Sequence, residues 1–329
     1  MKKRKAVLLA AGAFCLLMCL LSLCLGAAKL TLPQLWQAIL RGPTYTDGWI
    51  FWYSRLPRTM GCLLSGAALA LSGAVIQSVL NNKLASPSII GVNAGAGLAV
   101  TLCCALGLLS GWCIAGAAFL GALTAVLTVM FVAKKTGASR STVILGGVAI
   151  NSFLNAISEA VTVLLPEVGV LSGDFRVGGF ASINHHRLIP AGIFIVLAML
   201  ILLSLCNELD VLALGEETAQ GLGMNVKTMR TLFLLLAAML AGASVSFAGL
   251  LGFVGLIVPH AARKLLGSES RNLLPLCALG GAGFVCGCDL AARLIFAPYE
   301  LPVGILMAVL GGPFFLLLLA KGKGGRSND

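Results

Sequence analysis

The longest uncharged stretch of the chain, residues 84–133, contains no Asp, Glu, Lys or Arg and is rich in Leu, Ala, Val and Gly. A membrane-spanning helix needs about 20 apolar residues, so this stretch alone has room for two spans. Inside a bilayer every backbone N–H and C=O needs a partner within the protein, which only helices and closed barrels provide. The apolar runs lack the two-residue alternation of barrel strands. The sequence therefore predicts an all-α integral membrane protein.

Similar apolar runs recur along the whole chain and predict nine spans. They cover residues 6–28, 59–82, 84–133 (two spans with a turn near 107–112), 141–165, 188–206, 231–259, 272–296 and 302–320. The first run is longer than the 7–15 apolar residues, roughly, of a signal peptide, so we interpret it as an uncleaved helix. A tenth, short helix is expected over residues 258–266, beginning at Pro259. We expect these ten helices to form one transmembrane domain over residues 1–329.

The charge distribution predicts how the chain lies in the membrane. Only 11% of the residues are charged, against about 25% in a typical soluble domain. With ten spans, sixteen of the 23 Lys and Arg residues fall in predicted cytoplasmic segments and seven in outer ones, as the positive-inside rule requires. The net charge of +11 therefore indicates topology, not nucleic-acid binding. We expect a multi-pass membrane protein with both termini in the cytoplasm.

The eleven cysteines do not indicate a metal site or a redox centre. Most of them lie inside apolar runs, and no two are spaced as C-x-x-C. A cysteine in such a place is usually a small apolar packing residue. We expect no metal and no cofactor bound by this chain.

Two segments hint at an internal repeat. Residues 71–91 and 245–267 each contain a run of small residues, then a polar break with a proline, then a new helix. In the predicted topology the two segments run in opposite directions. Inverted repeats with broken helices are typical of transporters.

Five further stretches, in order along the chain, carry a resemblance to a known family. They are Arg55-Leu-Pro-Arg58 with residues 66–73 and Gln77; residues 82–85 with Pro87, Gly91, Gly95 and Ala96; residues 215–223; residues 252–260 with Arg263 and Gly267; and Asp289, Arg293, residues 300–304 and 312–315. Together they resemble the FecCD family of ABC importer permeases, which serve ferric siderophores, haem and cobalamin. The resemblance implies the type II importer fold, with ten helices per subunit. It also implies a place in the bacterial plasma membrane, a second permease subunit around a central path, two cytoplasmic ATPase subunits and an external substrate-binding protein.

The predicted cytoplasmic segment, residues 207–230, is too short for a nucleotide-binding domain, and the chain has no Walker A sequence. ATP and magnesium would therefore be bound by a partner ATPase, and this chain would not be an enzyme. Part of the segment resembles the family's coupling helix, which sits in a cleft of the ATPase: Glu216, Glu217, Thr218, Ala219, Gln220, Gly221, Leu222 and Gly223. A plain surface helix that joins two spans is the alternative.

Three arginines are predicted at the outer ends of spans. Arg55 and Arg58 precede the second span and Arg293 ends the ninth. They resemble the arginines with which related permeases dock acidic residues of the binding protein, and a guanidinium suits bidentate bonds to carboxylates. The alternatives are snorkelling to the interface and, for Arg293, an i,i+4 pair with Asp289.

Four residues fall where the resemblance places a cytoplasmic gate. Asn82 and Leu84 follow the second span, and Ser141 and Thr142 open the fifth. Lys83 stands where the family usually has proline. This replacement removes the fixed φ of proline and adds a charge. A plain helix end with a positive-inside lysine is the alternative.

Two other functional classes remain open. A secondary transporter could use Glu159 and Asp289 as coupling acids, although it would have no use for an ATPase-docking helix. An intramembrane enzyme based on Ser244 and His260 is disfavoured, because His260 belongs to the family's Pro-His stretch. Among cargoes we favour a ferric siderophore over haem or cobalamin. The sequence does not decide whether the second subunit is another copy of this chain or a close paralogue.

Overall fold

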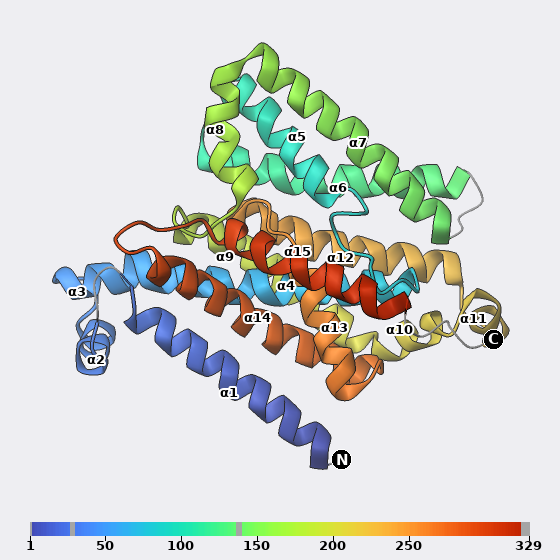
Figure 1. The fold of residues 1–329 in the computed structure, drawn as a ribbon, viewed down its shortest axis with the longest axis horizontal. Helices are drawn as coiled ribbons and strands as arrows, with labels where there is room; N and C mark the ends of the chain where they lie inside the picture. Colours follow the sequence, from blue (N-terminus) through green and yellow to red (C-terminus); the bar gives the residue numbers. More distant parts are fainter. Residues whose placement is uncertain (1, 27–29, 136–139, 324–329) are drawn as a thin grey trace.

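The computed structural model describes residues 2–26, 30–135 and 140–323, and every regular element in these ranges is a helix. Seven helices are long and apolar enough to cross a membrane, and Val92–Ala105 and Val303–Leu317 are shorter apolar helices. Most of the long helices lie side by side (Figure 1). The prediction of an all-α membrane protein is confirmed.

Ten helices match the ten predicted ones. They are α1 (Lys2–Cys24), α4 (Leu56–Val79), α5 (Val92–Ala105), α6 (Gly111–Lys135), α7 (Arg140–Leu164), α9 (His185–Ser204), α12 (Val226–Ala248), α13 (Val254–Leu266), α14 (Ser270–Ile295) and α15 (Val303–Lys323). Six shorter elements join them: α2 (Leu32–Arg41), α3 (Thr46–Trp49), the π-helix η1 (Ile50–Arg55), α8 (Pro166–Val177), α10 (Cys206–Ala213) and α11 (Glu216–Gly221).

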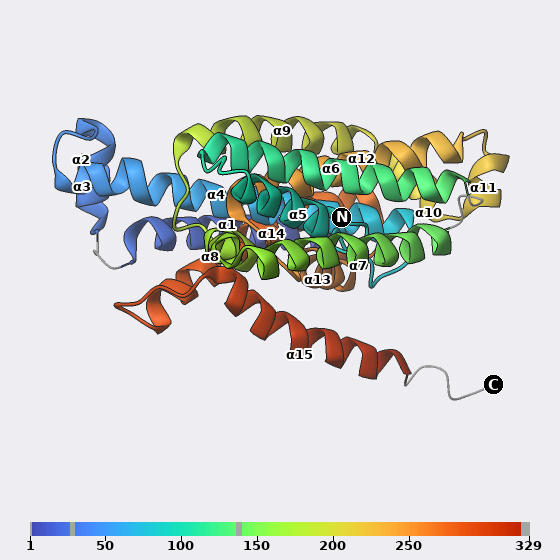
Figure 2. The ribbon, with the colours of Figure 1, turned by 90° about the horizontal axis from the view of Figure 1, so that it is seen from above.

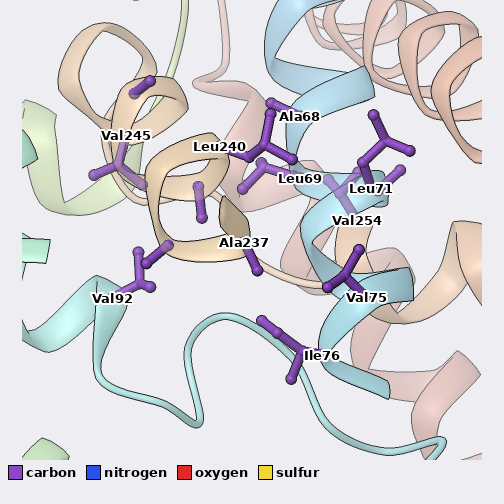
Figure 3. Close-up of a cluster of buried hydrophobic side chains, with 14 of the residues drawn as sticks. Ala68, Leu69, Leu71, Val75, Ile76, Val92, Ala237, Leu240, Val245 and Val254 are labelled. Carbon is purple, nitrogen blue, oxygen red and sulfur yellow. The ribbon is translucent and has the colours of Figure 1, made fainter. Parts of the chain in front are cut away.

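The helix α4 lies at the centre of the bundle, between α12 and α14 (Figures 1 and 2). Glycines make this close packing possible. A Cβ on Gly66 would overlap the carbonyl oxygen of Gly281, and one on Gly73 would overlap that of Gly255. Leu69, Leu71, Val75 and Ile76 of α4 and Leu240 and Val245 of α12 are buried in the same hydrophobic core (Figure 3). In a bilayer such close packing, rather than the hydrophobic effect, holds helices together.

Two helices of the bundle are followed by a break and a new helix. After α4, Asn81 has φ 47°, and Gly91, with φ 101°, is the N-cap of α5. After α12, Gly249 has φ 69°, and Phe253, with φ 64°, is the N-cap of α13. Figure 1 shows α4 running toward α11 and α12 running back from it. The two segments of the predicted repeat thus share one form and run in opposite directions.

The prediction that the tenth helix begins at Pro259 is wrong, because α13 begins at Val254 and Pro259 lies inside it. Proline has no N–H, so the carbonyl of Gly255, four residues earlier, loses its helical donor. The buried Gln77 of α4 replaces that donor, with Nε2 3.0 Å from the Gly255 oxygen. Arg263 of α13 in turn donates to Oε1 of Gln77. A side chain from another helix therefore makes the internal proline tolerable.

Candidate functional site

The predicted site residues gather mainly at two opposite ends of the bundle. The arginine end holds η1, the start of α4 and the end of α14. The α11 end holds α10, α11 and the start of α12 (Figure 1). The side-chain contacts of the two ends differ.

Arg58 is the centre of an ion-pair cluster at the arginine end. Its Nε lies 3.0 Å from Oδ2 of Asp289, and its NH2 lies 3.0 Å from Oδ1 of the same carboxylate. Its NH1 donates to Oε2 of Glu300 at 2.6 Å. The Asp289 side chain is only 1% exposed, whereas that of Glu300 is 38% exposed. Arg58 thus bridges a buried acid and a surface acid.

Arg293 and Arg55 complete this cluster, and both are buried. Arg293 lies 3.0 Å from Asp289 through Nε and donates from NH2 to the Ser22 hydroxyl of α1 at 2.8 Å. Arg55 donates to the carbonyl of Leu25, which also accepts from Arg293 NH1 at 3.2 Å. A buried charge is tolerated only when it is paired and hydrogen-bonded. The cluster therefore ties α1, η1, α4 and α14 together.

The position of the arginines differs from the expectation in one respect. Arg55 and Arg58 do not precede the second span; they lie inside a continuous helical segment, Thr46–Val79. The apolar run from residue 59 did not reveal this, because the two arginines and Pro57 interrupt the apolar sequence, whereas the helix continues from the π-helix η1 into α4. Their role in docking a binding protein stays a prediction. Arg58, with 13% of its side chain exposed, is the most accessible of the three.

At the α11 end, a short helix is held between two glycines. Gly215 has φ 121° and Gly223 has φ 82°, values that disfavour any side chain. Ala219 faces the bundle and is fully buried, while Glu217, Thr218 and Gln220 are exposed. The segment forms the helix expected there, but α12 begins earlier than predicted, at Val226.

Two polar contacts fix the α10–α11 segment on the bundle. Glu216 Oε2 lies 2.9 Å from NH2 of Arg230 in α12. The Asp210 carboxylate accepts from the backbone N–H of Ser270, the first residue of α14, at 2.9 Å. A carboxylate at a helix N-terminus is favourable because it complements the helix dipole. Movement of α11 would therefore be transmitted to α12, and movement of α10 to α14.

The predicted gate residues lie on two segments that pack together further along. Asn82 forms a local turn, since its Oδ1 accepts from the Leu84 N–H at 2.9 Å. Ser141 and Thr142 lie in the first turn of α7. Further along α7, Asn151 connects the helix to the loop after α4, because its Nδ2 donates to the Ser88 carbonyl at 2.7 Å.

Sequence reasoning missed Asn151, although an amide inside an apolar run signals an interhelical bond. Lys83 is exposed in the turn after α4. The gate role of the four residues stays a prediction.

Metal-binding groups are dispersed in the part of the chain that the structure describes. Within it, no group of three or more His, Cys, Asp or Glu side chains could hold a metal ion. The cysteines there are free thiols. Burial raises the pKa of the Cys206 thiol at the start of α10, which keeps it protonated. Such a thiol packs like an apolar side chain.

Broken antiparallel helices, a buried charge cluster and a surface helix between two spans define a helical membrane transport protein. Comparison with known proteins gives the family. The model of the FecCD transport family matches residues 14–321. The chain belongs to this family.

Individual relatives agree with this assignment. The Fe(3+)-citrate import system permease protein YfmD of Bacillus subtilis is 40% identical over 82% of this chain and 80% of its own length. The hemin transport system permease protein HmuU of Yersinia pestis is 34% identical over 92% of each chain. A solved structure, described as an inward-facing conformation of a metal-chelate type ABC transporter, is similar with a TM-score of 0.85 and 30% identity. This similarity covers 96% of this chain and 99% of the other.

Proposed function

We propose that this chain is the membrane-spanning permease of an ATP-driven ABC importer for a metal chelate, and that its cargo is a ferric siderophore. The observation that carries the proposal is α11. It is a short exposed helix between two glycines, and the Glu216–Arg230 ion pair connects it to a spanning helix. This is the geometry expected of a lever that a partner protein pushes.

The two ends of the bundle suggest two sets of partners. At the α11 end, the exposed Leu214 and Leu222 flank the helix and offer apolar contacts to a cytoplasmic ATPase. At the arginine end, a carboxylate of a substrate-binding protein could replace Glu300 on NH1 of Arg58, because Glu300 is the most exposed member of the cluster. With the α11 end facing the cytoplasm, both termini lie in the cytoplasm as well. This chain itself neither makes nor breaks a covalent bond.

A second permease subunit is also part of the proposal. In Figure 2, α15 diverges from the other helices. Both α7 and α15 expose large apolar side chains, including Leu145, Phe153, Val309 and Leu316. These surfaces would contact a second subunit, which is either another copy or a close paralogue, and the surrounding lipid.

The relatives' names include iron citrate, iron-hydroxamate and hemin, and also vitamin B12. Iron chelates are the more frequent among these names, so we favour a ferric siderophore, with haem and cobalamin as alternatives. An ion-coupled secondary transporter is disfavoured for a structural reason. Its proposed coupling acid Asp289 is held in ion pairs by Arg58 and Arg293, and breaking these pairs would leave uncompensated buried charge.

The test is co-purification with the candidate ATPase in nanodiscs, before and after residues 216–223 are replaced by a Gly/Ser linker. We expect the ATPase to bind the intact chain and to be lost from the altered one. A matched control, Glu167→Gln in α8, changes an exposed acid far from α11 and should retain the ATPase. Failure of the intact chain to bind any ATPase, together with solute uptake driven by an ion gradient alone, would refute the importer assignment.

A further inference from the structure

A cavity of about 450 Å³ opens at the α11 end, between the end of α6, the start of α7 and the first turns of α12. Its lining includes the cations Lys134, Lys227 and Arg230 and the apolar side chains Leu127, Phe131 and Leu234. Its volume lies within the range of about 300–1,000 Å³ that small-ligand pockets occupy. No step of the proposed transport cycle uses this cavity.

The polar part of this cavity carries only positive charge. Lys134, Lys227 and Arg230 line it, and none of the lining residues that the structure describes is an acid. Within the described part of the chain, neither Lys134 nor Lys227 forms an ion pair. The cavity also lies at the N-terminus of α12, where the helix dipole adds positive potential. A ligand that fits this part must be an anion.

The rest of the cavity is apolar and faces outward. Leu127 and Phe131 are exposed on the surface of α6, a helix that is long and apolar enough to cross the membrane. Leu234 and Val143 form the inner wall. A free anion would leave these apolar side chains without contacts. A molecule with an anionic head and an apolar tail would satisfy both parts.

We propose that this cavity binds the headgroup of an anionic phospholipid. The phosphate lies among Lys134, Lys227 and the first turn of α12, and the acyl chains run along Leu127 and Phe131 into the bilayer. Basic pockets between spanning helices on the cytoplasmic side are suited to such headgroups. The choice of a lipid of the inner leaflet rests on the proposed orientation, in which the α11 end is cytoplasmic.

The position of Arg230 gives the bound lipid a further effect. Arg230 lines the cavity and also pairs with Glu216, the first residue of α11. A phosphate in the cavity and the Glu216 carboxylate therefore act on the same cation. Lipid binding would loosen or reposition the contact that connects α11 to α12.

The experiment is native mass spectrometry of the purified full-length chain, titrated with phosphatidylglycerol or with zwitterionic phosphatidylcholine. We expect the anionic lipid to bind preferentially. The double variant Lys134→Gln/Lys227→Gln should bind it about twenty-five-fold more weakly, since each lysine near an anionic lipid contributes roughly a further factor of five to affinity. The matched control Lys3→Gln/Lys5→Gln removes two exposed lysines from α1 and should leave the affinity unchanged.

Three outcomes would overturn the proposal. Equal affinities for the two lipids would show that charge does not select the ligand. Equal losses in the two double variants would show that the basic cavity is not the site. Displacement of the lipid by excess inorganic phosphate alone would assign the cavity to a free anion. Because the titration contains no ATPase, its result is independent of whether an ATPase binds the chain.

Discussion

The two ends of the bundle use charge in opposite ways. At the arginine end, three largely buried guanidinium groups are bonded to Asp289, Ser22 and Leu25, and Glu300 is the acid that reaches the surface. At the α11 end, Lys134 and Lys227 are exposed, and α11 is tied to α12 by an ion pair whose acid is 40% exposed. A buried network resists change because breaking it leaves uncompensated charge, whereas the buried Arg230 has a partner that is exposed and can be exchanged with less loss. The first end holds helices together, and the second is the end that we propose to move.

The largest expected effect is at Asp289. Asp289→Asn removes the carboxylate that pairs with Arg58 and Arg293 and leaves two cations without it. We expect a loss of about 3–5 kcal/mol of stability, measured by thermal or denaturant unfolding in detergent. Glu300→Gln, at the exposed edge of the same cluster, should cost less than about 1 kcal/mol. Equal effects of the two changes would show that burial does not distinguish the two acids.

The next largest loss of stability is expected where two helices pack closely through glycine. In Gly73→Ala, the new methyl group overlaps the carbonyl oxygen of Gly255, and we expect destabilisation by about 1–3 kcal/mol. Gly97→Ala is the matched control, because its Cβ would lie 3.7 Å from Leu250 Cδ1. It should be neutral or slightly stabilising, since alanine favours the helix. The interpretation fails if both changes lower the unfolding temperature equally.

A further prediction concerns the internal proline of α13. Gln77→Leu removes both the donor to the Gly255 carbonyl and the acceptor for Arg263, so we expect a loss of about 1–3 kcal/mol. Pro259→Ala restores a backbone N–H that can satisfy Gly255. A double-mutant cycle should therefore show coupling between the two positions. Strictly additive effects would mean that Gln77 does not compensate for Pro259.

The smallest effect on stability is expected at the α11 end. Glu216→Gln removes the charge of a side chain that is 40% exposed but keeps an oxygen that can accept from the buried Arg230, so it should change stability by less than about 1 kcal/mol. Its effect should instead appear in function, as a weaker response of the bound ATPase to the loaded binding protein. ATPase assays in nanodiscs measure this. A large loss of stability with a normal ATPase response would reverse the contrast between the two ends.

The spans could be predicted from the sequence because an uncharged run of about 20 apolar residues is rare in soluble proteins and matches the thickness of a bilayer. The short elements α2, α3, η1 and α8 were not predicted, since they are shorter than a span and carry polar residues. The pairing of Arg293 with Asp289 was one of the alternatives that the i,i+4 spacing offered. The pairing of Arg58 with Asp289 joins residues 231 positions apart, and no local pattern contains that information. Pro259 was misinterpreted for the same reason, because the donor that rescues its helix lies in α4.

Uptake of a labelled ferric siderophore into proteoliposomes, which contain this chain, its candidate ATPase and its binding protein, tests the importer mechanism as a whole. We predict uptake that requires ATP, falls when residues 216–223 are replaced by a flexible linker, and is not supported by an ion gradient. Uptake that persists without ATP, or that is unaffected by loss of α11, would rule out a permease driven through this helix.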